Sequence, residues 1–176
     1  VTLFDTSEGI FECIEYVLEK MNYQKVERSL LSKFIGPPVY ESFSKICGMN
    51  EEDANIATKM YREMYVKEFV AKSKLYDSME DLLAFLKENG VKVAIATMKT
   101  QPQIDKLLEI TDMSGTFDSV RGADTVIKNT KADLIKLVLS DLGENPQNAV
   151  MVGDTLSDGK GASVAKTDFI AVAYGF

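Results

Sequence analysis

Residues 149–158 read AVMVGDTLSD, an apolar run that ends in Gly-Asp and carries a second aspartate four positions further on. This pattern predicts a buried strand that places carboxylates at its C-terminal end. Asp154 and Asp158 would repel one another unless a cation neutralises them or one is protonated, and Mg²⁺ prefers such carboxylate oxygens. A strand followed by a polar turn would give the same letters without a metal, so residues elsewhere must decide between the two interpretations.

The composition is that of a soluble globular protein, with 45% hydrophobic and 27% charged residues among 176. The formal charge of −7 argues against non-specific binding to nucleic acid or to anionic membranes. The absence of histidine excludes serine–histidine nucleophile pairs, histidine zinc sites and a histidine base. Carboxylates, lysines, hydroxyls and bound metal therefore remain for any chemistry.

The cysteines and the hydropathy indicate the compartment. Cys13 and Cys47 lie far apart in sequence and form no CxxC motif, which indicates reduced thiols. No apolar run approaches the roughly 18 residues that a membrane span requires, and no signal peptide is visible. We therefore expect a cytoplasmic protein without membrane or nucleic-acid partners.

The second part of the sequence alternates between helical and strand patterns. A β-prone run at 1–4 adds a further strand. Strands separated by helices predict a doubly wound parallel, Rossmann-like α/β core, in which ligands bind at the C-terminal ends of the strands. The expected helices are 78–89, 103–110, 131–142 and 158–166, and the expected strands are 91–97, 117–120, 149–152 and 169–172.

Between the first strand and this alternation lies a helical segment. Apolar residues at three-to-four spacing predict about four consecutive helices over 7–74, interrupted by the double proline at 37–38. We expect residues 6–74 to form an inserted all-helical cap domain, and residues 1–5 and 75–176 to form the Rossmann-like catalytic core.

The strand ends of the predicted core collect polar side chains. Asp5 follows the first strand, Thr97 ends the second, and Asp154 follows the strand of the 149–158 stretch, with Asp158 one turn later. Lys131 begins the helix that precedes that strand, with Lys128 as a rival for its role. A carboxylate nucleophile, a hydroxyl, a lysine and two metal-binding acids are the groups that phosphoryl transfer through an aspartyl-phosphate needs.

In this order the motifs resemble the haloacid dehalogenase superfamily of hydrolases, in particular its phosphoglycolate phosphatase-like branch with a helical cap. The resemblance covers nearly the whole chain. It is carried by LFD at 3–5, TSEGI at 6–10, FIGPP at 34–38, YRE at 61–63, IAT at 95–97, Lys131 in NTKADLIKLVL, and VGDTLSD followed by GA at 161–162.

The resemblance implies a Mg²⁺-dependent phosphatase that acts on a small phosphorylated metabolite, a phosphoglycolate-like monoester, as a monomer or homodimer. It implies Asp5, Thr97 and Lys131 as catalytic residues, with Thr97, the backbone N–H of Met98 and Lys131 on the phosphoryl oxygens. It also implies that Asp5, Asp154 and Asp158 hold the metal. The alternatives are a pyrophosphatase, a nucleotidase, a sugar phosphomutase, or a binding protein of this fold whose first motif is lost.

The first motif departs from the family pattern, Asp-x-Asp-Gly-Thr followed by a short flap. Here LFD runs directly into TSEGI, so about seven residues, including the general acid/base, are absent if Asp5 is the nucleophile. In a second register Thr2 is the motif threonine, Asp5 belongs to the cap helix, and the nucleophile precedes Val1. We prefer the first register, because residues 1–4 are the only candidate for a central strand, without which the sheet would be divided.

Overall fold

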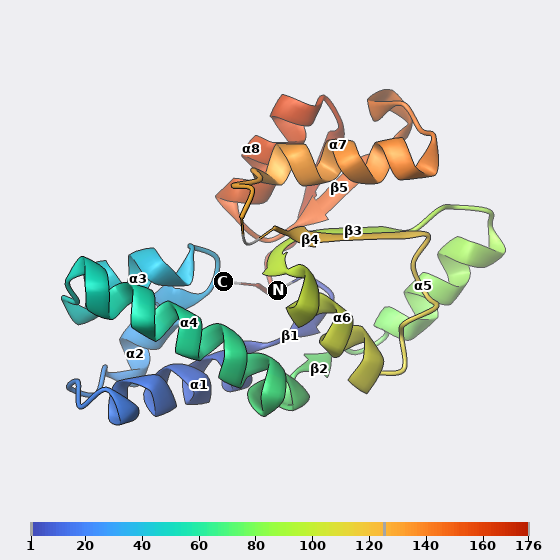
Figure 1. Cartoon of the computed structure of the whole chain (residues 1–176). Coiled ribbons are helices and arrows are strands. Elements are labelled where there is room, and N and C mark those ends of the chain that lie inside the picture. The colour runs from blue at the N-terminus through green and yellow to red at the C-terminus, as the bar shows by residue number, and fades with distance from the viewer. Residues whose placement is uncertain (1, 125, 176) are drawn as a thin grey trace. The chain divides into compact units, whose positions relative to one another are not determined.

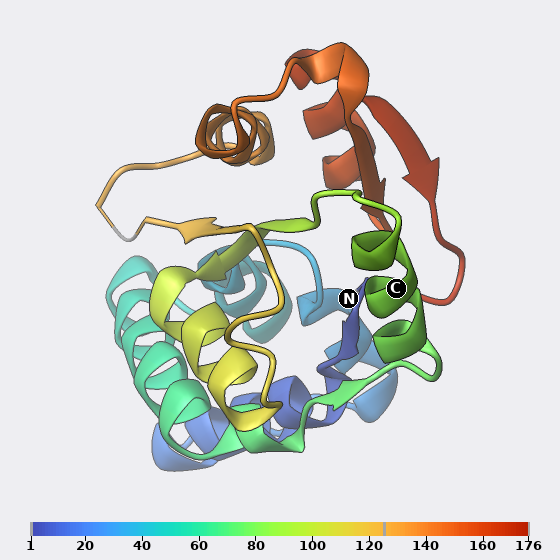
Figure 2. The ribbon, with the colours of Figure 1, turned by 90° about the vertical axis from the view of Figure 1, so that its right-hand side faces the viewer.

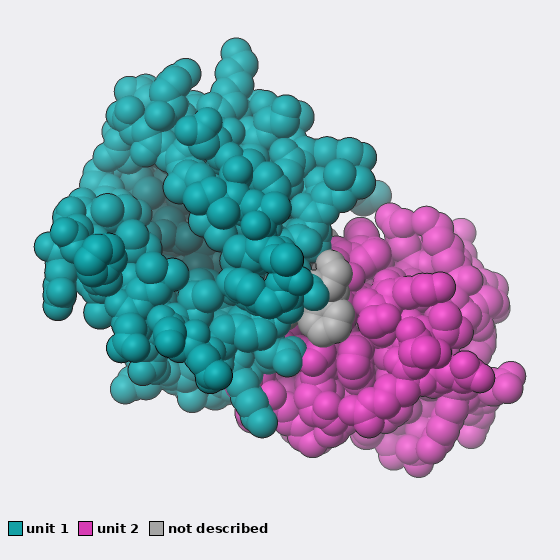
Figure 3. Space-filling model, turned by 180° about the vertical axis from the view of Figure 1, so that it is seen from behind, with its two compact units in different colours: residues 1–5, 74–176 teal, residues 6–73 magenta. Residues whose placement is uncertain are grey.

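The computed structural model describes residues 2–124 and 126–175. The chain divides into two compact units, which Figure 3 colours separately. Unit 1 comprises Val1–Asp5 and Lys74–Phe176, and unit 2 comprises Thr6–Ser73. Among the described residues, no helix is both long enough and apolar enough to cross a membrane.

Unit 2 is built from helices, as the apolar spacing predicts. Its elements are α1 (Ser7–Lys20), α2 (Arg28–Leu31), η1 (Ser32–Phe34), α3 (Val39–Cys47), α4 (Glu51–Lys67) and η2 (Phe69–Lys72). The last α-helix of this unit ends at Lys67 and is followed by a separate 3₁₀ turn. Gly9 explains part of this packing, because a Cβ there would lie 2.3 Å from the carbonyl oxygen of Phe69, so α1 and η2 approach backbone to backbone.

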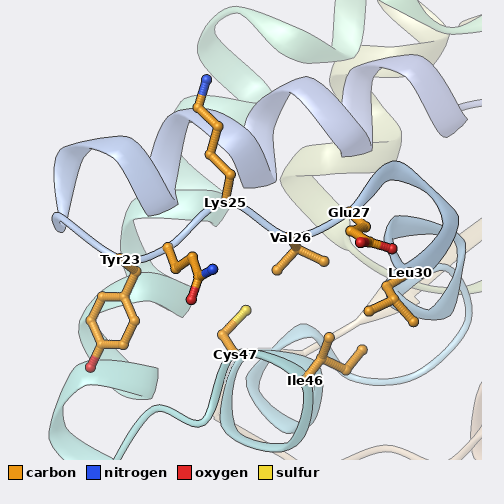
Figure 4. Close-up of a pocket in the computed structure, with 8 residues that line it drawn as sticks. Tyr23, Lys25, Val26, Glu27, Leu30, Ile46 and Cys47 are labelled. Atoms are coloured by element: carbon orange, nitrogen blue, oxygen red, sulfur yellow. The ribbon is translucent and has the colours of Figure 1, made fainter.

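Aromatic side chains pack against one another inside unit 2, among a larger number of aliphatic residues. Phe34, Phe43, Tyr61 and Tyr65 form a chain of ring contacts with centroids 5.5, 6.4 and 5.6 Å apart. The unit also contains a hollow of about 330 Å³, in which Val26, Ile46 and Cys47 point toward one another while Lys25 points away (Figure 4). The residues that line it are Tyr23, Gln24, Lys25, Val26, Glu27, Leu30, Ile46 and Cys47.

Unit 1 contains two β-α-β units of parallel strands, which confirms the predicted α/β class (Figure 1). The first consists of β3 (Ala94–Thr100), α6 (Gln101–Ile110) and β4 (Ser119–Ala123), and the second of β5 (Val150–Gly153), α8 (Leu156–Ala165) and β6 (Asp168–Ala171). The remaining elements are α5 (Met79–Glu88), the connecting helix α7 (Lys131–Leu142) and η3 (Pro146–Asn148).

Helix α7 ties the two β-α-β units together. It packs against β3, β4 and α8, and Figures 1 and 2 show it running beside α8. The apolar cluster beneath it combines Ile135, Leu139 and Ala165 with Ala96, Ala149 and Met151, so both strand pairs contribute to one core. The C-terminal ends of β3 and β5 are positioned through this shared core.

The first strand differs from our expectation of a central parallel strand. Strand β1 (Phe4–Asp5) pairs antiparallel with β2 (Lys74–Leu75), with Phe4 opposite Leu75 and Asp5 opposite Lys74. The pairing is extended by the Tyr76 N–H, which donates to the Leu3 carbonyl at 3.0 Å. Two residues from each segment satisfy this ladder, so the first strand does not enter the parallel sheet. Within residues 2–124 and 126–175, the strands consequently form three two-stranded ladders, and β3 does not pair with β5.

Candidate active site

The chain turns sharply from β5 into α8, and this turn fixes the orientation of Asp158. Thr155 caps α8, and its hydroxyl accepts the Asp158 N–H at 3.2 Å. In return, Oδ2 of Asp158 accepts the Thr155 N–H at 3.0 Å and the Thr155 hydroxyl at 2.7 Å. Gly153 permits the tight turn, because a Cβ there would lie 2.5 Å from the Asp158 Cβ. Asp158 is therefore buried, with one carboxylate oxygen held by the cap.

The other oxygen of Asp158 meets Lys131. The Lys131 Nζ lies 2.8 Å from Oδ1 of Asp158, and the two side chains are 10% and 7% exposed. The same ammonium donates to the carbonyl of Ala96 at 2.9 Å, which brings it to β3. Burial alone would raise the pKa of the Asp158 carboxyl, but the charge and hydrogen bond of Lys131, together with two hydrogen bonds from Thr155, outweigh burial and lower that pKa. The pair is therefore a buried ion pair that joins α7, α8 and β3.

Thr97 and Met98 follow Ala96, whose carbonyl accepts from Lys131, and they do not end the strand as expected. Strand β3 continues to Thr100, and its register with β4 shifts between Thr97 and Thr100. Such a bulge leaves the intervening residues outside the regular ladder and redirects side chains, as is common near active sites. The Thr97 hydroxyl oxygen accepts the Lys99 N–H at 3.2 Å, and as a hydroxyl it also carries a proton to donate.

Asp154 has a separate set of neighbours. Its Oδ1 accepts a hydrogen bond from the Thr2 hydroxyl at 3.0 Å, and the Thr2 carbonyl accepts the Tyr174 hydroxyl at 2.9 Å. The rings of Tyr76 and Tyr174 pack edge to face with centroids 4.8 Å apart. Burial raises the pKa of the Tyr76 phenol, and the charges of Asp5 and Asp154 raise it further. Asp5 and Asp154 thus share one electrostatic environment in unit 1.

The structure therefore groups the predicted residues around two carboxylates. Lys131 and Asp158 meet directly beside the Ala96 carbonyl, next to Thr97, and Asp154 lies at the start of the same turn. Sequence reasoning missed Tyr76 and Tyr174, for which a single aromatic letter outside a periodic pattern gives no signal. Thr2 was predicted as a site residue only in the second register of the first motif.

The donor groups fit a magnesium ion in part. Among the described residues, no three Asp, Glu, Cys or His side chains gather into a ready metal site. Asp154 fits the ion, because Mg²⁺ is usually bound by one or two carboxylates together with substrate phosphates and water. Asp158 fits it less well, since Lys131 occupies one of its oxygens and the α8 cap the other.

The comparisons agree with this architecture. The tyrosine-protein kinase PtkA of Mycobacterium tuberculosis is 30% identical over 177 residues, which cover 99% of this chain and only 60% of that protein. The pyrophosphatase PpaX of Bacillus velezensis is 33% identical over 175 residues, covering 98% of this chain and 79% of that protein. The crystal structure of a predicted phosphatase from Clostridium acetobutylicum superimposes with a TM-score of 0.88 at 33% identity, covering 98% of this chain and 81% of that one.

The sequence also matches the haloacid dehalogenase-like hydrolase family over residues 1–172. The chain therefore belongs to the haloacid dehalogenase-like hydrolases, the family that its motifs predict.

Proposed function

We propose that this protein is a Mg²⁺-dependent phosphatase that hydrolyses the phosphate monoester of a small metabolite through an aspartyl-phosphate. The observation that carries the proposal is the buried ion pair between Lys131 and Asp158, whose ammonium also reaches the Ala96 carbonyl of β3. Burying an ammonium to 90% costs free energy unless the ammonium is paired with an opposite charge. Buried ionisable groups of this kind are concentrated at functional sites. Phosphoryl transfer needs a fixed cation at that point.

The roles of the individual side chains follow from their partners. Lys131, held by Asp158 and the Ala96 carbonyl, would neutralise charge on the phosphoryl oxygens. Thr97 would donate its hydroxyl proton to a phosphoryl oxygen, and the Met98 N–H would assist from the bulge. Asp158 serves as the residue that orients Lys131, which differs from the direct metal contact that the resemblance implies.

Asp154 is the residue that we expect to hold the metal. Its carboxylate would take the ion together with oxygens of the substrate phosphate. When bound, Mg²⁺ supplies positive charge beside the transferring group. Asp154 itself is oriented by the Thr2 hydroxyl.

Three observations support the second register of the first motif, in which Asp5 is not the nucleophile. Strand β1 pairs with β2 instead of lying between β3 and β5, and Thr2 hydrogen-bonds Asp154. The alignments to PtkA and PpaX run over 177 and 175 positions and include 98–99% of this chain, which leaves no room for a gap of about seven residues after Asp5. We therefore propose that Thr2 is the motif threonine and that the nucleophilic aspartate precedes Val1. Asp5 then stands at the entry to α1.

The substrate class is drawn from the same chemistry. One lysine and one metal-binding carboxylate suit a single phosphoryl group, so a small monoester such as a phosphoglycolate-like metabolite is our first choice. A pyrophosphatase is the second, because the pyrophosphatase PpaX is 33% identical to this chain. A non-catalytic binding protein is the third, supported by the absence of a three-ligand metal cluster among the described residues. We also propose a cytoplasmic monomer or homodimer.

The experiment is hydrolysis of p-nitrophenyl phosphate by the complete protein and by two lysine variants of α7. We expect Lys131→Ala to lower kcat/KM by about 10²-fold or more, the usual effect of removing one electrostatic stabiliser. Lys136→Ala, an exposed lysine on the same helix, should leave it unchanged. Equal activity in Lys131→Ala and its parent would refute the assignment.

Two further variants separate the registers of the first motif. In the second register, Thr2→Val disturbs the orientation of Asp154 and lowers activity, whereas Asp5→Asn retains most of it. If Asp5 is the nucleophile, Asp5→Asn abolishes activity instead.

A further inference from the structure

We infer that Gly161 on α8 is a positioning residue, because its missing side chain provides the space through which the stem of Lys131 reaches Asp158. A Cβ added at Gly161 would lie 2.4 Å from Cγ and 2.9 Å from Cβ of Lys131. Contacts shorter than 3.0 Å are essentially never tolerated by real Cβ atoms, so Lys131 or α7 would have to move. The role of Gly161 in catalysis rests on the proposed function, whereas its close contact with the stem of Lys131 does not.

Both ends of the Lys131 side chain are fixed, so the stem cannot move aside freely. Its backbone begins α7, where Thr130 and Asp133 form a reciprocal cap: Thr130 Oγ1 accepts the Asp133 N–H at 3.2 Å, and Asp133 accepts the Thr130 N–H at 2.8 Å. Its ammonium is held by Asp158 and by the carbonyl of Ala96. Any shift of the stem therefore pulls on one of these anchors.

Helix α8 presents two matching features to Lys131. Asp158 and Gly161 are three residues apart, a spacing that puts them on the same face of a helix, one turn after another. Asp158 receives the ammonium, and Gly161 leaves room for the methylene groups. The same face thus provides both the charge and the space that determine where the ammonium lies.

Gly159 offers a matched control on the same helix. A Cβ at Gly159 would lie 3.2 Å from Cε1 of the Phe169 ring, the edge of a side chain that is itself partly exposed. Gly159→Ala and Gly161→Ala gain the same helix propensity and differ in what the new methyl group meets. A difference between them therefore reports the contact with Lys131.

The experiment combines Gly161→Ala, Gly159→Ala, Lys131→Ala and the double variant Lys131→Ala/Gly161→Ala in the complete protein. Urea unfolding midpoints are measured for all of them, and kcat and KM for p-nitrophenyl phosphate are measured with Mg²⁺. We expect Gly161→Ala to lower the midpoint and to lower kcat/KM at least tenfold, and Gly159→Ala to keep kcat/KM within twofold.

In the Lys131→Ala background the 2.4 Å contact with Cγ is gone and only the 2.9 Å contact with Cβ remains, so Gly161→Ala should lower the midpoint less than it does in the parent and change kcat no further. If Gly161→Ala alone fails to fold, folding of the double variant supports the inference and failure of both overturns it. The inference is also overturned if Gly161→Ala matches Gly159→Ala, or if it lowers the midpoint equally in both backgrounds. Absence of activity in the parent would refute the proposed phosphatase and leave the midpoints to test the packing.

Discussion

The ion pair between Lys131 and Asp158 allows a quantitative prediction. Lys131→Met removes the charge and keeps the stem, and Asp158→Asn removes the charge and keeps an oxygen for the α8 cap. Removing one partner of a buried pair costs about 3–5 kcal/mol. We expect about 3 kcal/mol for each variant, because the group left behind keeps a partner: the Ala96 carbonyl still accepts from the ammonium in Asp158→Asn, and Thr155 still donates to Asp158 in Lys131→Met. With roughly 2–4 °C per kcal/mol for a chain of this size, each variant should unfold about 6–12 °C lower.

The double variant measures the coupling between the two charges. Lys131→Met/Asp158→Asn leaves no unpaired charge, so its cost should fall short of the sum of the single costs by about 2 kcal/mol. The exposed pair between Lys106 and Glu109, at 3.0 Å on α6, is the matched control. Lys106→Met should cost no more than about 0.5 kcal/mol.

The assays are urea unfolding at pH 7, with each variant fitted at a common slope, and thermal unfolding, both followed by circular dichroism. Additive costs for Lys131→Met and Asp158→Asn, or single costs no larger than that of the Lys106 control, would refute the buried ion pair as described.

Two further predictions concern the rest of the chain. Gly9→Ala should destabilise unit 2 by about 1–3 kcal/mol, the usual cost of overpacking, because its methyl group would meet the Phe69 carbonyl; Gly115→Ala, where nothing lies within 4 Å, is the control, and equal midpoints would contradict the close approach. Hydrogen bonding by Arg121, and then by Ser119, lowers the pKa of Asp141 to about 2. The ionised Asp141 carboxylate therefore stabilises the folded chain. Its contribution to the free energy of unfolding is complete above the ordinary carboxyl pKa and is lost as the pH falls through about 2. In Asp141→Asn the free energy of unfolding should therefore vary less between pH 5 and pH 2 than in the parent. An unchanged dependence on pH in this range would contradict the stabilising role of the Asp141 carboxylate.

The sequence predicts the helices best where local signals mark both ends. Helix α7 runs from Lys131 to Leu142 as expected, because Thr130 caps its start and Gly143 adopts the left-handed conformation at its end. The helices of unit 2 follow from apolar spacing alone. The 3₁₀ turn of η2 does not, because it depends on the approach of the Phe69 carbonyl to Gly9 across the unit.

Tertiary pairing limits the prediction of the strands and of the site. Strand β2 has two residues, too few for an alternating pattern, and so the antiparallel partner of β1 was not foreseen. Lys131 and Asp158 were both identified from their positions, but their pairing joins residues far apart in sequence through the contact of α7 with α8. No local pattern distinguishes an aspartate that binds a metal from one that orients a lysine.

The proposed phosphatase site depends on Asp154 to hold Mg²⁺ beside the cation of Lys131. The most direct measurement is the rate of p-nitrophenyl phosphate hydrolysis by the complete protein, with Mg²⁺ and after its removal by EDTA, in the parent and in Asp154→Asn. We predict activity in the parent that requires Mg²⁺ and falls at least about 10²-fold in Asp154→Asn. Hydrolysis that persists in EDTA, or that Asp154→Asn retains in full, would contradict the claim.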